Sequence, residues 1–303
     1  MSDRLHIKAK SVVAPNAAWI ERLRQMDVVF VIDTTGSMDA AIHEVAYRMG
    51  EIVAALRAAP AQPNVFFGVV AYRDYEDEKL TYLVKAEPLT GKVPLVERML
   101  KGLKADGGFD FEEAVYDGLY YAISRTYWRE ASTRLILLVG DAPPHPEALN
   151  RVTLAEVIKG AYAKNVIVHT IGVGSHAEMV RTFREIAHNC RGRYLQLLDT
   201  PQLIAHLLEL LNQAAHKMRD DVNVMSGNID GMSDTQVDDA QARLKEKLGK
   251  GKTAEGQAAL NAMEQLLDTA RKNKPRVNLH SPRDVEPPTS KTMGKDQSRK
   301  SDK

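Results

Sequence analysis

Three oxygen-bearing side chains stand at alternate positions in Asp33-Thr34-Thr35-Gly36-Ser37, directly after the apolar run Val28–Ile32. One carboxylate and two hydroxyls are hard oxygen ligands, which suit Mg²⁺ rather than zinc or copper. A turn after such a run lies beyond the carboxyl end of a strand, which is where open α/β sheets bind ligands. The segment therefore predicts a cation site formed by Asp33, Thr35 and Ser37. The alternative is an ordinary helix start, because Asp and Ser are also good N-caps.

Two further carboxylates are placed where they could complete this site. Asp141 follows the apolar run Leu135–Gly140, so it emerges at the same edge of a parallel sheet as Asp33. Asp110 lies in a loop with two glycines, which allow close approach to a metal, but it could also cap the next helix. Asp141 could instead begin a turn. We predict a site for Mg²⁺, or for Mn²⁺ or Ca²⁺ in its place, made of Asp33, Thr35, Ser37, Asp110 and Asp141.

The elements that must position these residues alternate between strand and helix. Strand-like apolar runs occupy residues 27–32, 65–72, 135–140, 166–173 and 194–197, with a weaker edge-strand candidate at residues 80–84. Helical patterns fall at residues 42–56, 93–103, 112–128, 154–164, 177–188 and 201–218. Strands covered on both faces are nearly continuous in Val, Ile and Leu. We therefore predict an α/β fold with a doubly wound, mostly parallel six-stranded sheet and helices on both faces.

A strand ending in Asp-x-Thr-x-Ser, a glycine loop before a helix, and a later strand ending in Asp occur here in that order. Together they resemble a von Willebrand factor type A domain with its metal-ion-dependent adhesion site, over about residues 27–218. Within that superfamily three segments are most similar to the branch associated with alpha-type protein kinases: Ala71–Tyr75, Gly107–Asp110 and Asp141–His145.

The resemblance implies a Rossmann-like fold and metal ligands at Asp33, Ser37 and Asp141, with Thr35 in a position usually held by Ser. The glycine loop departs from the family pattern. Many adhesion-type members have Thr directly after the two glycines, whereas this chain has Phe and then Asp110, which we take as the ligand. A carboxylate there would add negative charge beside the ion, which would strengthen metal binding and weaken the attraction for an acidic residue of a partner.

The resemblance also implies an intracellular module that recognises a protein partner through the cation, with an acidic partner residue at the metal, in a kinase- or ATPase-linked assembly. A competing hypothesis is a metal-dependent hydrolase or phosphatase that uses Asp33, Asp110 and Asp141, with His145 as a base. A third is a scaffold that works through its C-terminal helices without metal. We favour the binding module over an enzyme, because the sequence shows no second metal cluster and no nucleophile–base pair.

Composition narrows the class of protein. The 303 residues are 44% apolar and 27% charged, as in ordinary globular proteins, and one cysteine excludes an intrachain disulfide and a cysteine zinc cluster. The N-terminus lacks a signal-peptide core and no run has the length of a membrane span, so we expect a cytoplasmic protein without membrane contact. Residues 271–303 carry ten Lys or Arg against four Asp or Glu. Residues 219–303 lack aromatic side chains for base stacking, so we do not expect nucleic-acid binding.

We divide the chain into an N-terminal extension (1–26), the von Willebrand factor A domain (27–218), a helical extension (219–272) and a basic disordered tail (273–303). The extension contains two helices, at residues 233–248 and 253–272, each opened by a Ser or Thr that could cap it. Arg73 and Asp74 follow a strand, and we favour an ion pair between them over a role in orienting the site. His169 lies within a strand, which predicts a core histidine.

Overall fold

The computed structural model describes residues 17–59, 61–108, 111–198, 202–249 and 253–273. The predicted ligand Asp110 lies outside the described residues, as does the predicted disordered tail (273–303) except for its first residue, Asn273, which ends a helix. The strands are β1 (Gln25–Asp33), β2 (Asn64–Tyr72), β3 (Val84–Thr90), β4 (Thr133–Gly140), β5 (Val166–Val173) and β6 (Tyr194–Leu197). They form one sheet in the order β3-β2-β1-β4-β5-β6. Every pairing is parallel except that of β2 with β3, which confirms the predicted mostly parallel sheet.

The edge strand was predicted in the wrong place. Residues 80–83 lie in the turn after a short 3₁₀ helix, Glu76–Lys79, and β3 begins only at Val84. Four successive residues of β3 are exposed, so its sequence carries no apolar pattern. Pro88 lies within it, which an edge strand tolerates because one of its sides has no ladder hydrogen bonds to make.

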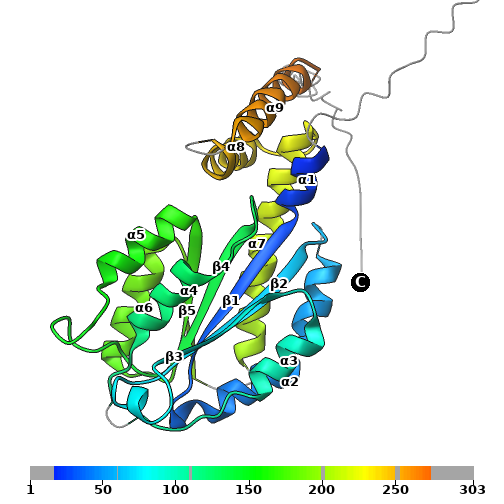
Figure 1. The fold of residues 1–303 in the computed structure, drawn as a ribbon. Helices are drawn as coiled ribbons and strands as arrows, with labels where there is room; N and C mark the ends of the chain where they lie inside the picture. The colour runs from blue at the N-terminus through cyan, green and yellow to red at the C-terminus, as the bar shows by residue number, and fades with distance from the viewer. Residues whose placement is uncertain (1–16, 60, 109–110, 199–201, 250–252, 274–303) are drawn as a thin grey trace, which may run out of the picture.

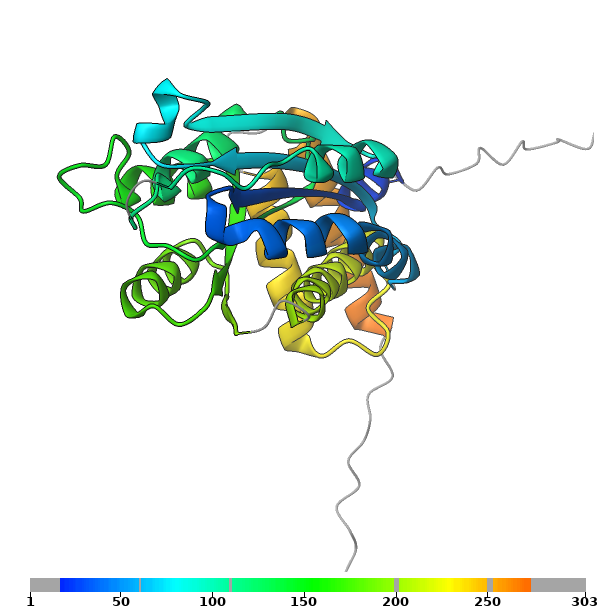
Figure 2. The same ribbon diagram turned by 90° about the horizontal axis from the view of Figure 1, so that it is seen from below.

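Helices cover both faces of the sheet (Figures 1 and 2). Along the chain they are α1 (Ala17–Leu23), α2 (Asp39–Ala58), α3 (Val93–Lys101), α4 (Val115–Arg125), α5 (Leu154–Lys164), α6 (Ala177–Asn189), α7 (Gln202–Ser226), α8 (Asp234–Leu248) and α9 (Ala254–Asn273). Side chains of β1 alternate between two cores, because successive residues of a strand point to opposite faces. Val28 and Phe30 pack with α2, α3 and α7, whereas Val29 and Val31 pack with α4, α5 and α6.

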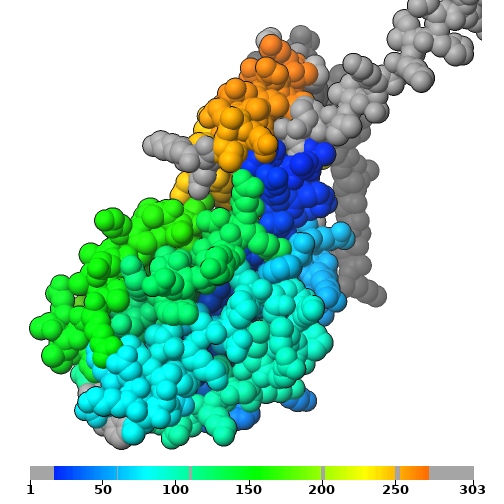
Figure 3. Space-filling view, viewed as in Figure 1, coloured from blue at the N-terminus to red at the C-terminus, as the bar shows by residue number. Residues whose placement is uncertain are grey.

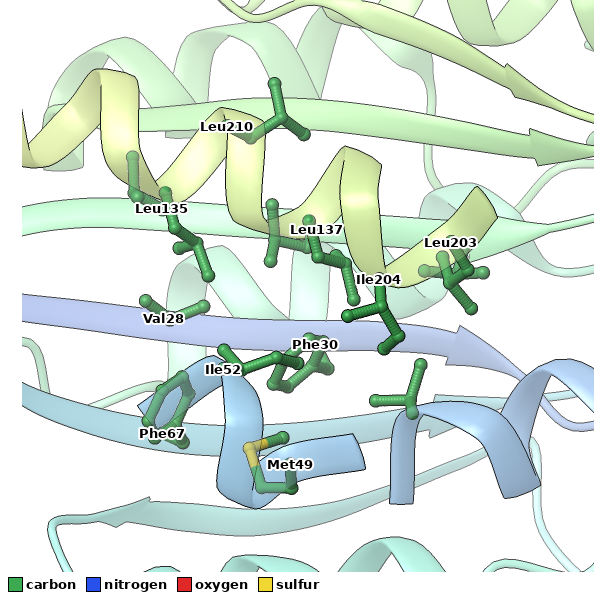
Figure 4. Packing of buried hydrophobic residues seen from close by; sticks show 14 of the residues in the cluster. Val28, Phe30, Met49, Ile52, Phe67, Leu135, Leu137, Leu203, Ile204 and Leu210 are labelled. Atoms are coloured by element: carbon green, nitrogen blue, oxygen red, sulfur yellow. The ribbon is translucent and has the colours of Figure 1, made fainter. Parts of the chain in front are cut away.

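Figure 4 shows the first of these cores. Residues of α7 pack there over those of β1 and β4: Leu203, Ile204, Leu210, Val28, Phe30, Leu135 and Leu137. Met49 and Ile52 of α2 complete the layer from the side of β2. This layer fixes α2, and with it the turn between β1 and α2 that carries the predicted ligands.

Helix α7 continues to Ser226, beyond its predicted end at Met218. Its continuation joins α1, α8 and α9 around a third apolar cluster, which contains Trp19, Leu23 and Val224. These helices form a lobe at the end of the molecule opposite the carboxyl ends of the strands (Figures 1 and 3). Ser233 caps α8 in a capping box with Gln236, as its position predicted. Among the described residues, none of the helices is both long and apolar enough to cross a membrane.

Candidate metal centre

The parallel register brings the carboxyl ends of β1, β2 and β4 together. Asp33, the last residue of β1, is aligned with Tyr72 of β2, and Ile32 is aligned with Val139 of β4. After Asp33 the chain turns through a 3₁₀ helix, Gly36–Met38, into α2. Neither Thr35 before the 3₁₀ helix nor Met38 before α2 makes a side-chain cap hydrogen bond, so the polar residues of this turn are not explained by helix capping.

The two oxygens of the Asp33 carboxylate have different surroundings. Oδ1 accepts hydrogen bonds from the backbone N–H of Thr35 at 2.9 Å and from the Thr35 hydroxyl at 2.7 Å. Oδ2 is buried and has no hydrogen-bond partner among the described residues. A buried carboxylate oxygen without a donor is costly, because it has lost water and gained nothing in exchange. A cation bound at Oδ2 would remove this cost.

Burial, together with the nearby charge of Asp141, raises the pKa of Asp33 from 3.8 to about 7, against the lowering effect of the hydrogen bonds from Thr35 and of the charge of Arg73. Without a cation, the carboxylate is therefore held partly protonated near neutral pH. A divalent ion would compensate both the burial and the repulsion from Asp141.

The structure places most of the predicted ligands at one edge. Asp141 directly follows β4, is half-buried, and acts electrostatically on Asp33. Ser37 lies in the 3₁₀ helix of the same turn as Asp33 and Thr35 and is exposed. The fifth predicted ligand, Asp110, belongs to the segment that is not described.

Glu113 is a carboxylate of this edge that the sequence analysis missed. It is 2% exposed, and its backbone N–H donates to the carbonyl of Pro143, which joins it to the loop after β4. Its Oε1 and the Cβ of Thr35 both line the space where a side chain at Gly108 would lie, at 3.4 and 3.1 Å from an added Cβ. Glu113 thus connects the three loops that resemble the family's metal site.

Tyr72 lies among these carboxylates. Burial raises its pKa well above the usual value, and Asp33, Glu113 and Asp141 raise it further, so the phenol stays neutral. Its hydroxyl is buried without a hydrogen-bond partner in the described chain. It would lie 2.6 Å from a Cβ at Gly140, so only glycine fits at the end of β4. Sequence reasoning treated Tyr72 only as the end of a strand.

Arg73 and Asp74 do not pair with each other, so the favoured ion pair was a wrong prediction. Arg73 instead donates to the hydroxyls of Thr34 and Thr81 and to the Lys104 carbonyl, which ties the turn after β1 to the segment before the glycine loop. Asp74 lies 2.7 Å from Nε2 of His145 in a buried pair.

His145 is held by more than this pair. Its ring stacks on Tyr75 with 4.7 Å between ring centroids, and it lines a cavity of about 460 Å³ together with Pro143, Pro144 and Tyr116. The other histidine considered from sequence, His169, is 8% exposed, which confirms its prediction as a core residue.

The donor set fits a hard cation. Within the described residues, His, Cys, Asp and Glu side chains nowhere gather in threes that could hold a metal alone. A site here would therefore combine carboxylates with the hydroxyls of Thr35 and Ser37. The buried, partnerless Oδ2 of Asp33 is the atom that such an ion would satisfy.

The chain is similar to several known proteins. Alpha-protein kinase vwkA of Dictyostelium discoideum is 30% identical over 120 residues, which are 40% of this chain and 19% of that protein. The chain therefore spans about a fifth of the length of this relative. Solved structures that it resembles include a von Willebrand factor type A protein from Catenulispora acidiphila (TM-score 0.48, 19% identity, 63% of this chain and 43% of the other). Another is proximal thread matrix protein 1 from the mussel byssus with a zinc-occupied MIDAS motif (TM-score 0.48, 17% identity, 63% and 46%).

The family model of the von Willebrand factor A domain matches residues 27–199, which is more than half of the chain. The match begins within β1 and extends just beyond β6, so it contains most of β1, all of the other strands and the turn that carries Asp33. The chain belongs to the von Willebrand factor A domain family.

Proposed function

We propose that this chain is a metal-dependent protein-binding module whose cation, Mg²⁺ by the hardness of its ligands, is held at the carboxyl edge of the sheet by Asp33, Thr35, Ser37 and Asp141. The observation that carries the proposal is the buried Oδ2 of Asp33, which lacks a partner among the described residues. A bound ion would supply a positive charge beside exposed loops, and a carboxylate of a partner could complete its coordination.

In our proposal the glycine loop that precedes α4 supplies a further ligand to this site, either Asp110 or Glu113. Asp110 is the ligand expected from sequence, and Glu113 is the buried carboxylate next to Thr35 and Gly108. The variants Asp110→Asn and Glu113→Gln separate the two, because each removes one charge with little change in size. The variant that loses more metal affinity identifies the ligand.

The partner is a protein in our proposal, and a kinase- or ATPase-linked assembly inside the cell is its setting. The relative from Dictyostelium, named as an alpha-protein kinase, supports this setting. A hydrolase would need a base that reaches the ion. His145 is instead engaged with Asp74 and Tyr75, which favours a structural role for it in the loop after β4.

Two measurements test the proposal. Isothermal titration with MgCl₂ and MnCl₂ should show one saturable site in the wild-type chain and none in Asp33→Ala. Affinity purification should then capture a partner in Mg²⁺ and lose it both in EDTA and with Asp33→Ala. Asp268→Ala, which changes an exposed aspartate of α9, is the matched control and should behave as wild type in both experiments.

Other outcomes have clear meanings. Capture that persists in EDTA and with Asp33→Ala, but is lost when α8 and α9 are removed, would replace this proposal with the metal-free scaffold. Metal-dependent phosphatase turnover that disappears in both Asp33→Ala and His145→Ala would replace it with the hydrolase.

A further inference from the structure

The cavity of about 460 Å³ that His145 lines lies beside the metal centre. Its walls come from the loop after β4, from the chain at the starts of α4 and α5, and from one side of α6. The loop wall includes Pro143, two residues after Asp141, and the carbonyl of this proline accepts from the backbone N–H of Glu113. A partner that docks on the carboxyl edge of the sheet would therefore reach this cavity as well.

The lining of the cavity is anionic. It contains one arginine, Arg181, and four carboxylates: Glu112, Glu147, Glu178 and Glu185. Arg181 pairs with Glu178 and Glu185, its neighbours on α6. Glu112 and Glu147 make no hydrogen bond or ion pair with another described residue. With His145 neutral, four carboxylates against one guanidinium leave three negative charges in excess.

A buried side chain of the lining has a polar group without a partner. Tyr116 is only 8% exposed, and its hydroxyl makes no hydrogen bond within the described residues. Burial, together with the nearby carboxylates of the lining, raises its pKa to about 12, so the phenol stays neutral. A buried hydroxyl without a partner has lost water and gained nothing in exchange, so a hydrogen-bonding group that enters the cavity would remove this cost.

The Tyr116 hydroxyl lies within reach of two walls. The phenol interacts electrostatically with Glu147 of the loop and with Glu178 and Glu185 of α6. A group that binds the hydroxyl would therefore also be close to the carboxylate of Glu147, which has no cation of its own among the described residues. The charge that these carboxylates favour is positive.

His145 adds a second acceptor to the lining. Its side chain is 7% exposed, and Nε2 donates to Oδ1 of Asp74 at 2.7 Å. Nδ1 of the neutral ring therefore keeps a lone pair, and it has no donor in the described chain. The pair with Asp74 and the stacking on Tyr75 hold the ring in place. The groups that remain available to a ligand can all accept hydrogen bonds, so the ligand must supply donors.

The rest of the wall is apolar. Pro143, Pro144 and Pro146 of the loop and Leu154 at the start of α5 supply it. The volume lies within the range of about 300–1,000 Å³ that is typical of ligand pockets. A ligand that joins a cationic head to an apolar stem would match both parts of the lining.

We propose that this cavity receives an arginine side chain of the protein partner, with its guanidinium between Glu147 and Tyr116 and with Glu112 as a second uncompensated charge. A guanidinium is planar and has five N–H donors on an apolar stem, whereas the ammonium of lysine is compact and strongly hydrated. The origin of the arginine rests on the proposed function. The partner would present a carboxylate to the ion and an arginine to this cavity.

The test of the cavity uses the full chain in EDTA, so that it needs neither metal nor partner. The probe is N-acetyl-arginine methylamide, which represents an arginine inside a chain, and its binding is followed by the backbone amide signals of residues 143–150 and 178–185. Titration should be saturable. The citrulline analogue has the same shape without the charge and should not saturate. The lysine analogue should bind more weakly than the arginine probe.

Three variants test the assigned residues. Glu147→Lys reverses an exposed charge that makes no hydrogen bond or ion pair with a described residue, and it should weaken binding about tenfold to a hundredfold. Tyr116→Phe removes only the hydroxyl and should weaken binding about twofold to tenfold. Glu255→Lys, at an exposed position of α9, is the matched control and should bind the probe as wild type does.

The affinity purification tests whether the arginine belongs to the partner. Glu147→Lys should bind Mg²⁺ as wild type does and lose the captured partner, whereas Glu255→Lys should keep it. Unchanged capture by Glu147→Lys would overturn the assignment to the partner, as would tighter binding of free arginine than of the blocked probe. The cavity assignment is overturned if the blocked arginine does not saturate, if the citrulline analogue binds as tightly, or if Glu147→Lys and Glu255→Lys bind the probe equally well. Equal binding of the lysine analogue would overturn the choice of arginine.

Discussion

At the residue scale, the chemistry at the carboxyl edge of the sheet depends on the carboxylate of Asp33, whose two oxygens have different hydrogen-bonding environments. Thr35 satisfies Oδ1 of Asp33 twice, and Oδ2 is buried without a donor in the described structure. The hydrogen bonds fix the direction in which the carboxylate points, and the unsatisfied oxygen makes it a poor structural group. Such local cost is common at sites that are completed by a ligand.

This cost makes stability depend on pH. The pKa of Asp33 rises from 3.8 to about 7 on folding, so the metal-free folded state keeps a proton that the unfolded state releases. The stabilisation from that proton is complete below about pH 4 and is lost as pH rises to about 7, by about 1.4 kcal/mol per pH unit. The variant Asp33→Asn has no carboxyl group at this position to release a proton, so its stability does not fall in this way. Between pH 5 and 8 in EDTA, the variant should gain about 2–3 kcal/mol relative to wild type.

Urea denaturation at the two pH values measures this gain. Asp268→Asn, at an exposed position of α9, is the control and should track wild type. If the difference in free energy of unfolding between Asp33→Asn and wild type is the same at both pH values, Asp33 does not have the raised pKa. Saturating Mg²⁺ should restore the wild type, because the ion replaces the proton.

The sequence predicted the residues that directly follow strands, and it failed where contacts depend on loop paths. Asp33 and Asp141 could be assigned because parallel strands end at a common edge. Glu113 was missed because the helix was expected from Glu112, whereas α4 begins at Val115 and leaves Glu113 in the loop. Arg73 and Asp74 are adjacent in sequence, but successive side chains at a strand end point apart, so each finds another partner.

At the scale of elements, the buried Asp221 decides how α8 is attached to α7. Its carboxylate pairs with Arg243 and with Lys247, whose side chain is only 9% exposed. Asp221→Ala would leave a buried ammonium without its anion, which typically costs about 3–5 kcal/mol. The exposed pair of Arg271 with Asp238 is the matched control, and Asp238→Ala should cost less than about 1 kcal/mol. If urea denaturation shows that Asp221→Ala and Asp238→Ala lose the same free energy of unfolding, burial of the Asp221 ion pairs does not contribute to stability.

The same residue explains why the end of α7 could not be predicted. Four of the five residues 219–223 are polar, which suggested that the core-facing stripe ends at Met218. In the structure Asp221 is buried by its ion pairs and the stripe resumes at Val224 and Met225. An apolar pattern cannot reveal a buried carboxylate, because its partners lie more than twenty residues away on α8.

At the scale of the whole molecule, the chain has a ligand edge and a C-terminal lobe at opposite ends (Figure 1). A chain that ends at Ser226 would retain the sheet and the turn of Asp33, but would expose Trp19, Leu23 and Val224. We expect it to bind Mg²⁺ with the affinity of the full chain and to unfold several degrees lower. Titration calorimetry and thermal unfolding check the two parts, and a loss of Mg²⁺ affinity would contradict the separation of the two ends.

The overall architecture was the most predictable level. Parallel strands covered on both faces are recognisable from continuous apolar runs, and the confirmed sheet follows from them. The third apolar cluster was not foreseen, because it is assembled from α1 at one end of the chain and from α8 and α9 at the other. Contacts between residues so far apart in the sequence produce no recognisable local pattern of apolar residues.

Of the helices and strands in the described residues, α7 is the one that reaches from the carboxyl edge of the sheet into the C-terminal lobe. Its 25 residues form a rod about 37 Å long, which starts after β6 at the edge of Asp33 and ends in the lobe. A rod of intact backbone hydrogen bonds resists compression, so a displacement along its axis at one end cannot be absorbed midway. The carboxyl edge of the sheet and the C-terminal helices are therefore mechanically coupled through α7. A shift of this helix along its axis would move both ends together.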